Sequence, residues 1–348
     1  MKTAWKTFLT DNGAEFQDGN LVHFGNPLRE QEVALSGLVF ADLDYLGVLA
    51  VHGSDASDFL QSQLSNDIKL CEEQGSQLTA YCTPKGRILG LMRIFKQGDT
   101  FYLRLPADTL EAVLQRLRMF VLRADVTLED VSENFCCIGV SGAAAADEIR
   151  RAASQVPAGI NQVLHLEKLS IIRVPGIQPR YEVYASSLET AQAFWDTLNV
   201  DGAPVGSPAW RLLEIQSGIP NIFAETTELF VPQMVNLQLV DGVSFKKGCY
   251  PGQEIVARMQ YLGTLKRRMY PGLIDQDEAV SPGDELYQAS GNEQVIGRIV
   301  DAQPHPDGGF LALAVLQIKS ADAADIHLGG ANGPSFKMQT LPYPFEDQ

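Results

Sequence analysis

Two stretches of the chain repeat the same order of patterns, two strands followed by an amphipathic helix, and this order restricts the possible folds strongly. The expected segments are residues 88–95, 101–105 and 109–119 in the first unit, and 169–174, 181–185 and 188–198 in the second. In each unit, two short strand-type segments are followed by a helix, and the first helix has its apolar residues at helical spacing. Two similar β-β-α units predict an α+β protein with two related sheet layers.

Further short elements are expected between and before these units. They are strands at 33–38, 47–51, 77–82, 124–128 and 135–140, helices around 59–64 and 145–153, and a helix that begins with Trp210. The strands 77–82 and 88–95 flank a turn rich in Pro, Gly and Lys, which predicts an antiparallel hairpin.

The character of the sequence changes beyond Arg268. Short strands are expected at 270–273, 281–284, 295–300 and 310–317, separated by Gly, Pro and Asp turns, with little helical period. This pattern is typical of a small β-barrel. We therefore expect an N-terminal extension (1–32), an α+β region of two interleaved domains (33–268) and a C-terminal barrel (269–348).

Composition excludes several classes of protein. The chain is 45% hydrophobic and 20% charged, with no apolar run long enough for a signal peptide or a membrane span, so we expect a cytoplasmic protein with no membrane partner. Its five cysteines include no C-x-x-C pair and its five histidines are scattered, which argues against a disulfide framework and against a metal site.

The sequence from 246 to 254, Lys-Lys-Gly-Cys-Tyr-Pro-Gly-Gln-Glu, is the strongest candidate for chemistry. Glycines flank Cys249 and a helical pattern follows, so the thiol is expected in a loop just before a helix N-terminus. Such a position, with lysines nearby, lowers the pKa of a cysteine below its usual value of about 8.5 and favours a reactive thiolate. The same residues also fit a tight turn around a small buried hydrophobe.

The basic residues are concentrated around this motif. The chain has a net charge of −16, which argues against a general nucleic-acid binder, yet residues 246–270 contain six lysines and arginines and one acid. This segment would attract an anionic ligand, because clustered charge acts locally within about 8 Å. A solvated run of charge fits the pattern equally well.

Two other residues have both a structural and a functional interpretation. Trp210 fits a core position, and next to an anionic groove it would also stack on a flat ligand. Asp67 follows a predicted helix, where it fits a simple turn former.

The segment from Phe245 to Arg258 resembles the signature of the YgfZ-type folate-binding proteins, a branch related to the T-protein (aminomethyltransferase) of glycine cleavage. The resemblance extends from about Val33 to the C-terminus. Further motifs that carry it are residues 59–67, Lys85-Gly86-Arg87, Val231-Pro232-Gln233, Asn236-Leu237-Gln238 and Val295-Ile296-Gly297-Arg298.

The resemblance implies a ring of two α+β domains and a barrel around a central cavity that takes tetrahydrofolate or a one-carbon derivative. Cys249 is then the reactive thiol. The implied folate-binding residues are Trp210, Tyr45, Asp67, Gln233, Asn236, Lys247, Tyr250, Gln253, Glu254 and Arg258. A second family tryptophan has no match here, and Tyr45 stands in that region as a replacement or as an ordinary surface or core tyrosine.

Departures from T-protein argue against aminomethyl transfer. Gly90 and Leu91 align with the acidic pair that attends the folate nitrogen, and Cys249 replaces the aspartate of its Lys-Gly-Asp motif. Proton transfer needs a carboxylate or a similar group within hydrogen-bond reach.

The resemblance implies a folate-binding accessory protein that supports iron-sulfur proteins, including tRNA-thiolating enzymes, and thereby tRNA modification. The alternatives are a folate-dependent one-carbon transferase and a module that binds tRNA directly, which the acidic net charge disfavours.

Overall fold

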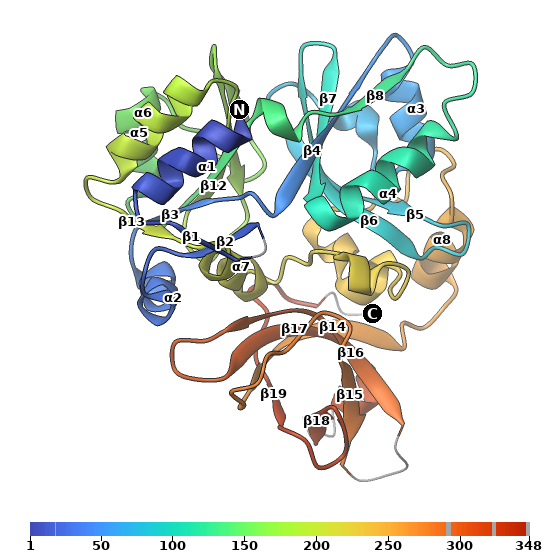
Figure 1. Cartoon of the computed structure of the whole chain (residues 1–348). Coiled ribbons are helices and arrows are strands. Elements are labelled where there is room, and N and C mark those ends of the chain that lie inside the picture. Colours follow the sequence, from blue (N-terminus) through green and yellow to red (C-terminus); the bar gives the residue numbers. More distant parts are fainter. Residues whose placement is uncertain (18, 290–293, 322–324, 346–348) are drawn as a thin grey trace.

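The computed structural model describes residues 1–17, 19–289, 294–321 and 325–345. Two layers of sheet and helix lie side by side above a C-terminal barrel, and both termini return to the body of the molecule (Figure 1). This arrangement confirms the expected α+β class with two related units and a barrel-like C-terminal sheet. Within the described residues, no helix is long and apolar enough to cross a membrane.

The first unit is a five-stranded antiparallel sheet in the order β5-β6-β7-β4-β8. Its elements are β4 (Leu46–His52), α3 (Ala56–Gln63), β5 (Ser76–Cys82), β6 (Ile88–Gln97), β7 (Thr100–Pro106), α4 (Ala107–Arg118) and β8 (Thr127–Asp130). The apolar faces of α3 and α4 pack on this sheet, where Phe59, Leu103 and Val113 share one buried cluster. The core therefore lies between the sheet and these two helices.

The second unit repeats the same connections in a six-stranded sheet, β10-β11-β12-β9-β3-β13. Its elements are β3 (Val39–Asp42), β9 (Cys136–Ser141), α5 (Ala145–Ala153), β10 (Val163–His165), β11 (Leu169–Val174), β12 (Arg180–Ala185), α6 (Leu188–Leu198) and β13 (Ala203–Val205). In the first unit β4 pairs with β7, and in the second β9 pairs with β12. The order β5-β6-β7-β4 therefore corresponds to β10-β11-β12-β9. The β-β-α repeat predicted from the sequence is confirmed.

The first 32 residues pack against the second unit. They form α1 (Lys2–Asp11), the hairpin of β1 (Glu15–Gln17) and β2 (Asn20–His23), and the start of α2 (Pro27–Ser36). Trp5 of α1 meets Trp195 of α6 edge-on, with ring centroids 5.5 Å apart. This segment therefore contributes to the same core as β9 and α6.

The C-terminal sheet is antiparallel, in the order β18-β15-β16-β17-β14-β19. Its elements are β14 (Arg267–Ile274), β15 (Glu285–Gln288), β16 (Val295–Pro304), β17 (Phe310–Gln317), the short helix α9 (Ile318–Ala321), β18 (Ile326–Leu328) and β19 (Phe336–Met338). A single bridge between His327 and Ser335 brings the two edges together. The sheet is thus a nearly closed barrel.

A connecting region joins the units to the barrel. It contains α7 (Ser207–Gln216), the 3-10 turns η3 (Ala224–Thr226), η4 (Pro232–Val235) and η5 (Leu237–Val240), and α8 (Gln253–Tyr261). The helix α7 packs against β16 and β17 of the barrel, and against α2 and β3 of the second unit. It therefore lies at the junction of the three parts.

The strand predicted at 33–38 is wrong, because these residues complete α2 and the loop after it. The side chain of Asn26 accepts a hydrogen bond from the backbone N–H of Arg29, and Pro27 occupies the first turn. This N-terminal cap starts a helix that continues to Ser36. The strand begins only at Val39.

Two other predicted strands need correction. Residues 281–284 form a turn, in which the backbone N–H of Ser281 donates to the Asp284 carboxylate and Gly283 has a positive φ of 91°. The strand expected at 124–128 lies at 127–130, because the preceding residues pack as a turn against residues 53–55. The Pro-Gly-Asp sequence at 282–284 thus forms the turn itself, and the start of the strand at 127 depends on contacts with residues 53–55.

Candidate functional site

The motif loop at 246–254 is anchored from below by Lys247. Its side chain is buried, and its Nζ donates to the backbone oxygens of Leu64 at 2.5 Å and Asn66 at 2.8 Å. Burial lowers the pKa of Lys247 to about 8, against the opposing effect of the Asp67 carboxylate. The lysine therefore ties the motif to the end of α3, more than 180 residues away in sequence.

Close backbone contact fixes the other side of the loop. Gly252 has a φ of +84° and a Cβ there would lie 2.5 Å from the carbonyl oxygen of Thr83. Gly86, in the turn between β5 and β6, also has a positive φ and faces Ile255 of α8. Because only glycine combines this backbone conformation with such close approach, the hairpin turn and the motif loop are held together.

Glutamine side chains complete this anchoring. Gln253, the first residue of α8, reaches back to the carbonyl oxygens of Lys247 and Gly248, at 3.4 and 3.3 Å. Gln233 donates to the carbonyl oxygen of Val256 at 2.6 Å, which joins η4 to α8. The two residues hold the loop and the start of the helix as one unit.

Cys249 is exposed at the top of this fixed loop, directly before α8. The other cysteines are buried or half-buried, and burial raises the pKa of Cys71, Cys82 and Cys136 to about 12 and that of Cys137 further. Those four thiols are therefore held protonated at neutral pH. Among the described cysteines, Cys249 is the one that is exposed on the surface.

Two more of the expected binding residues support this loop or its neighbours. Tyr250 is buried beneath it, 5.2 Å from the Lys247 ammonium to the ring centre, and burial raises the pKa of its hydroxyl. The Asp67 carboxylate accepts from Gln61 and from the backbone N–H of Lys69, so it caps the short turn η1 (Ile68–Leu70). These contacts are structural.

Asn236 serves a different junction. It adopts a positive φ of 58° between η4 and η5, and its side-chain amide donates to the carbonyl oxygen of Met269 at 2.9 Å. This bond joins the connecting region to β14 of the barrel. Its side-chain oxygen is buried without a hydrogen-bond partner.

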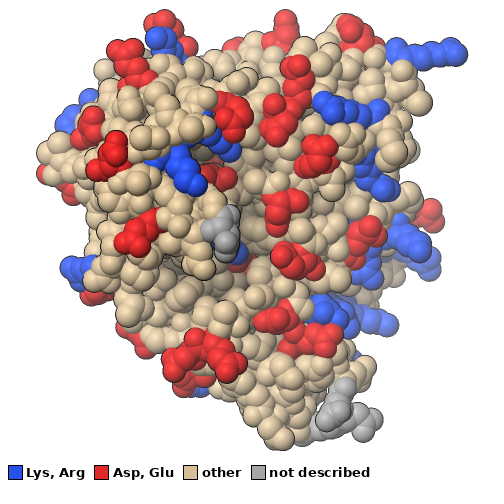
Figure 2. Space-filling model, viewed as in Figure 1, with Lys and Arg blue, Asp and Glu red and all other residues tan. Residues whose placement is uncertain are grey.

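The outer face of α8 carries one acid, one base and exposed apolar residues. Glu254 and Arg258 are exposed on it, and Tyr261 and Leu262 at its end are 67% and 85% exposed. Figure 2 shows lysine and arginine side chains gathered at the right of the molecule, where Figure 1 places α8 and the strand that follows. The basic segment predicted from the sequence is thus a surface feature beside the exposed thiol.

Trp210 and Tyr45 lie elsewhere, near the junction of the two units. The Trp210 indole is fully buried in the core between α7, β3 and β9, and the Arg180 guanidinium stacks on it at 4.5 Å. In this conformation the ring has no surface available to a ligand. Tyr45 is half-buried, and its hydroxyl donates to Glu214 at 2.9 Å.

These two residues border a buried network of charges that the sequence did not predict. Arg104 of β7 donates through two nitrogens to Glu182 of β12, and Tyr184 donates to the same carboxylate at 2.7 Å. Burial alone would raise the pKa of Glu182, but the positive charges of Arg104 and Arg93 lower it to about 2. The network joins the matching strands of the two units. Charged residues inside otherwise apolar strand patterns were the signal for it.

A pocket of about 380 Å³ opens beside this network. Tyr45 and Arg211 line it together with Asp108, Phe223 and Pro282, which come from the first unit, the connecting region and the barrel. Arg211 stacks on Phe223 at 4.4 Å and pairs with the buried Asp301 of β16. The pocket lies between the first unit, the connecting region and the barrel, and none of the motif residues 246–254 lines it. The central cavity between both units and the barrel, which the resemblance implied, stays a prediction.

Comparisons with known proteins match this architecture. Residues 16–247 match the model of the family described as the GCVT N-terminal domain. The tRNA-modifying protein YgfZ of Colwellia psychrerythraea (strain 34H / ATCC BAA-681) is 32% identical over 304 residues, which cover 87% of this chain and 92% of that protein. This chain belongs to the YgfZ-type family within the GCVT N-terminal domain group.

The fold of this YgfZ-type chain is also that of a glycine-cleavage protein. The crystal structure of glycine cleavage system aminomethyltransferase T from Bartonella henselae superposes with a TM-score of 0.78, covering 97% of this chain and 96% of that one. The two sequences are 16% identical, so the likeness shows the shared fold alone. The relation to T-protein inferred from the motifs is confirmed at the level of architecture.

Proposed function

We propose that this protein is a folate-binding accessory protein that supports iron-sulfur enzymes, and through them tRNA modification, with Cys249 as its reactive thiol. The observation that carries the proposal is the exposed thiol on a loop fixed by Lys247 and Gly252, while the other four cysteines are buried or half-buried. A fixed and accessible thiol is suited to contact a partner protein or a small electrophile.

Folate binding is proposed for the pocket beside Tyr45 and Arg211. Its volume of about 380 Å³ falls within the range of roughly 300–1,000 Å³ that small-molecule sites occupy. The side chains there fit such a ligand, because Tyr45 offers an aromatic edge and Asp108 an acceptor for ring N–H groups. The Arg211 guanidinium, which already pairs with Asp301, offers a further contact to a ligand carboxylate. Burial raises the pKa of Asp108, so this carboxyl also holds a proton more readily than usual.

The family relationship supports the link to tRNA. The relative from Colwellia psychrerythraea is named a tRNA-modifying protein. This chain is 32% identical to it over most of the length of both proteins. Direct tRNA contact is not required for that role, because the thiol and the bound folate support the enzyme that modifies tRNA.

Aminomethyl transfer has less support. Gly90 and Leu91 are buried in β6 and carry no acid, and a Cβ at Gly90 would lie 2.8 Å from Val113. The carboxylate pair that would assist proton transfer from an aminomethyl donor therefore has no place in this strand.

Titration of the purified protein with tetrahydrofolate tests the binding half of the proposal. We expect saturable quenching of the ligand signal, weakened about tenfold or more by Arg211→Gln, because this change removes a charge-assisted contact. Arg267→Gln on the surface of β14 is the matched control and should bind normally. Absence of saturable binding, or equal affinity in the Arg211 variant, would reject this pocket as the folate site.

A further inference from the structure

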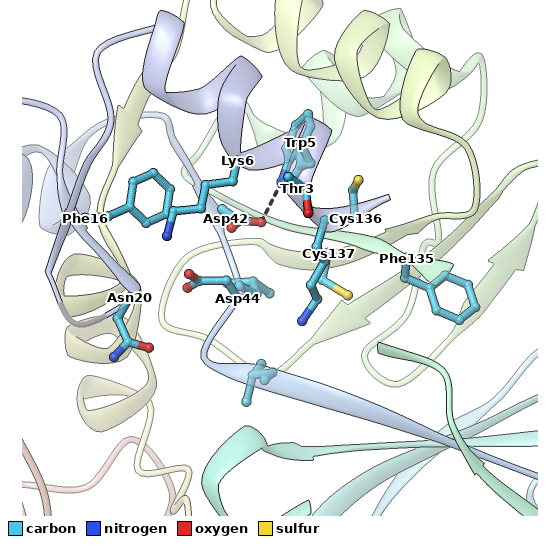
Figure 3. Close-up of a pocket in the computed structure, with 14 residues that line it drawn as sticks. Thr3, Trp5, Lys6, Phe16, Asn20, Asp42, Asp44, Phe135, Cys136 and Cys137 are labelled. Carbon is cyan, nitrogen blue, oxygen red and sulfur yellow. Dashed lines mark hydrogen bonds between the residues drawn. The ribbon is translucent and has the colours of Figure 1, made fainter. Parts of the chain in front are cut away.

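A second pocket, of about 280 Å³, lies between the N-terminal helix α1 and the start of the second sheet (Figure 3). Its lining combines three kinds of side chain. They are the apolar and aromatic residues Trp5, Phe16, Leu43, Leu46 and Phe135, the acids Asp42 and Asp44, and the bases Lys2 and Lys6. The pocket is separate from both the motif loop and the pocket beside Tyr45, because it shares no lining residue with the first and only Asn20 with the second.

The acids form one side of this pocket. Asp42 is 4% exposed and accepts from the Trp5 indole at 2.9 Å. Burial and the neighbouring Asp44 raise the pKa of Asp42 to about 8. Asp44 accepts from the backbone N–H of Leu21 and from the Ser207 hydroxyl, at 3.3 and 3.2 Å. Figure 3 shows both acids among the side chains that line the pocket, with the Asp42 carboxyl group at the Trp5 indole.

The lysines oppose these acids without pairing with them. Among the described residues, no ion pair involves Lys2, Lys6, Asp42 or Asp44, although the positive charges of both lysines favour ionisation of Asp44. The Lys6 ammonium lies instead 4.2 Å from the centre of the Phe16 ring. In the central network, by contrast, opposite charges close directly on one another. Here the acids and the lysines line one pocket, with no ion pair between them among the described residues.

A ligand that contacts both the acids and the lysines must carry both charges. A metal ion does not fit, because the two lysines repel a cation and the described residues contain no group of three or more ligating side chains. A simple anion does not fit either, because the carboxyl groups face it. A molecule with an ammonium group, a carboxylate and an apolar body matches all three kinds of lining.

We propose that this pocket binds a free α-amino acid with an apolar or aromatic side chain. The ammonium group lies on the Asp44 carboxylate beside Asp42, the ligand carboxylate faces Lys2 and Lys6, and the side chain packs on Trp5 and the other apolar residues. The volume of about 280 Å³ is close to the lower limit of small-molecule sites, which suits a ligand of this size.

Isothermal titration calorimetry of the full-length protein with L-phenylalanine, L-leucine and L-methionine tests the proposal. We expect saturable binding of at least one of them. Matched ligands that lack one charge, phenethylamine and 3-phenylpropanoate for L-phenylalanine, should bind about tenfold more weakly or worse, because each loses a charge-assisted contact. No saturable binding of any of the three amino acids up to about 10 mM would overturn the proposal, as would equal affinity for an analogue.

Variants place the site. Asp44→Asn should weaken binding about tenfold and Lys6→Gln two- to fivefold, since Lys6 is exposed. Lys168→Gln, which changes an exposed lysine in the turn between β10 and β11 and outside the pocket lining, should change nothing. Unchanged affinity in both pocket variants would overturn the assignment. Cys249→Ala should bind the amino acid normally, so failure of this site is distinguishable from failure of the proposed function.

Discussion

Replacement of Lys247 by methionine tests how the motif loop is held. Methionine keeps much of the buried stem but removes the Nζ donor, so the carbonyl oxygens of Leu64 and Asn66 lose their shared partner. Hydrogen bonds to a charged group contribute about 1.5–3 kcal/mol each, and the cost of burying the ammonium disappears with it. We therefore expect a net loss of about 2–3 kcal/mol in the free energy of unfolding.

Urea denaturation of the wild type and Lys247→Met at pH 7 measures this loss, with Lys246→Met as the matched control. Lys246 is the exposed neighbour, so its replacement should change the free energy of unfolding by no more than about 0.5 kcal/mol. A Lys247→Met variant as stable as the control would refute the claim that this ammonium anchors the loop.

The pH dependence gives a second, independent readout of the same residue. Because the folded pKa of Lys247 is about 8, below its usual value of about 10.5, the unfolded chain binds the proton first as the pH falls. The contribution of this residue to stability therefore rises with pH between about 8 and 10.5 and is constant below 8. The gap between wild type and Lys247→Met should widen over that window; a constant gap would show that the lysine titrates normally.

Three further predictions concern other contacts. Gly252→Ala should destabilise the protein by at least about 1–3 kcal/mol, from the positive φ and the contact with Thr83, while Gly248→Ala, which meets nothing within 4 Å, should stay within about 0.5 kcal/mol in the same denaturation assay. Glu182→Gln should cost about 3–5 kcal/mol, because it leaves the buried Arg104 without the carboxylate that it pairs with. The double variant Arg104→Met/Glu182→Leu should recover part of that loss. A neutral single variant would contradict the buried pair. The raised pKa of Asp42 means that the folded protein keeps a proton that the unfolded chain has released, so its contribution to stability falls as the pH rises from about 4 to 8. Asp42→Asn should remove that slope from melting curves recorded across this range, and an identical slope in both proteins would show that Asp42 ionises normally.

Local patterns predicted much of the fold. The apolar segments of β6 and β7, the turns that bound them and the apolar face of α4 are local features, so they were visible in the sequence. The helix α2 has local start signals in the Asn26 cap and Pro27, but the apolar residues of 33–38 also fit a strand, so the pattern there is ambiguous. The correct prediction of β6, β7 and α4 and the wrong one at 33–38 thus both follow from local sequence patterns.

The candidate site was only partly predictable. The loop position of Cys249 before a helix followed from its glycines, whereas the attachment of Lys247 to Leu64 and Asn66 joins segments far apart in sequence. Trp210 could not be placed from its spacing, because a core tryptophan and a stacking tryptophan look alike until Arg180 is seen against it. The network of Arg104 and Glu182 likewise exists only once the two units are brought together.

The most direct measurement of the central claim is the level of modified tRNA nucleosides, read by mass spectrometry, in a host that lacks its own relative of this protein. The wild-type chain should restore these nucleosides, and Cys249→Ala, produced at equal abundance, should leave them at the level of the deletion. Lys246→Met, which changes the exposed neighbour of the anchoring lysine, should restore them fully. Full restoration by Cys249→Ala would contradict the assignment of this thiol as the reactive group.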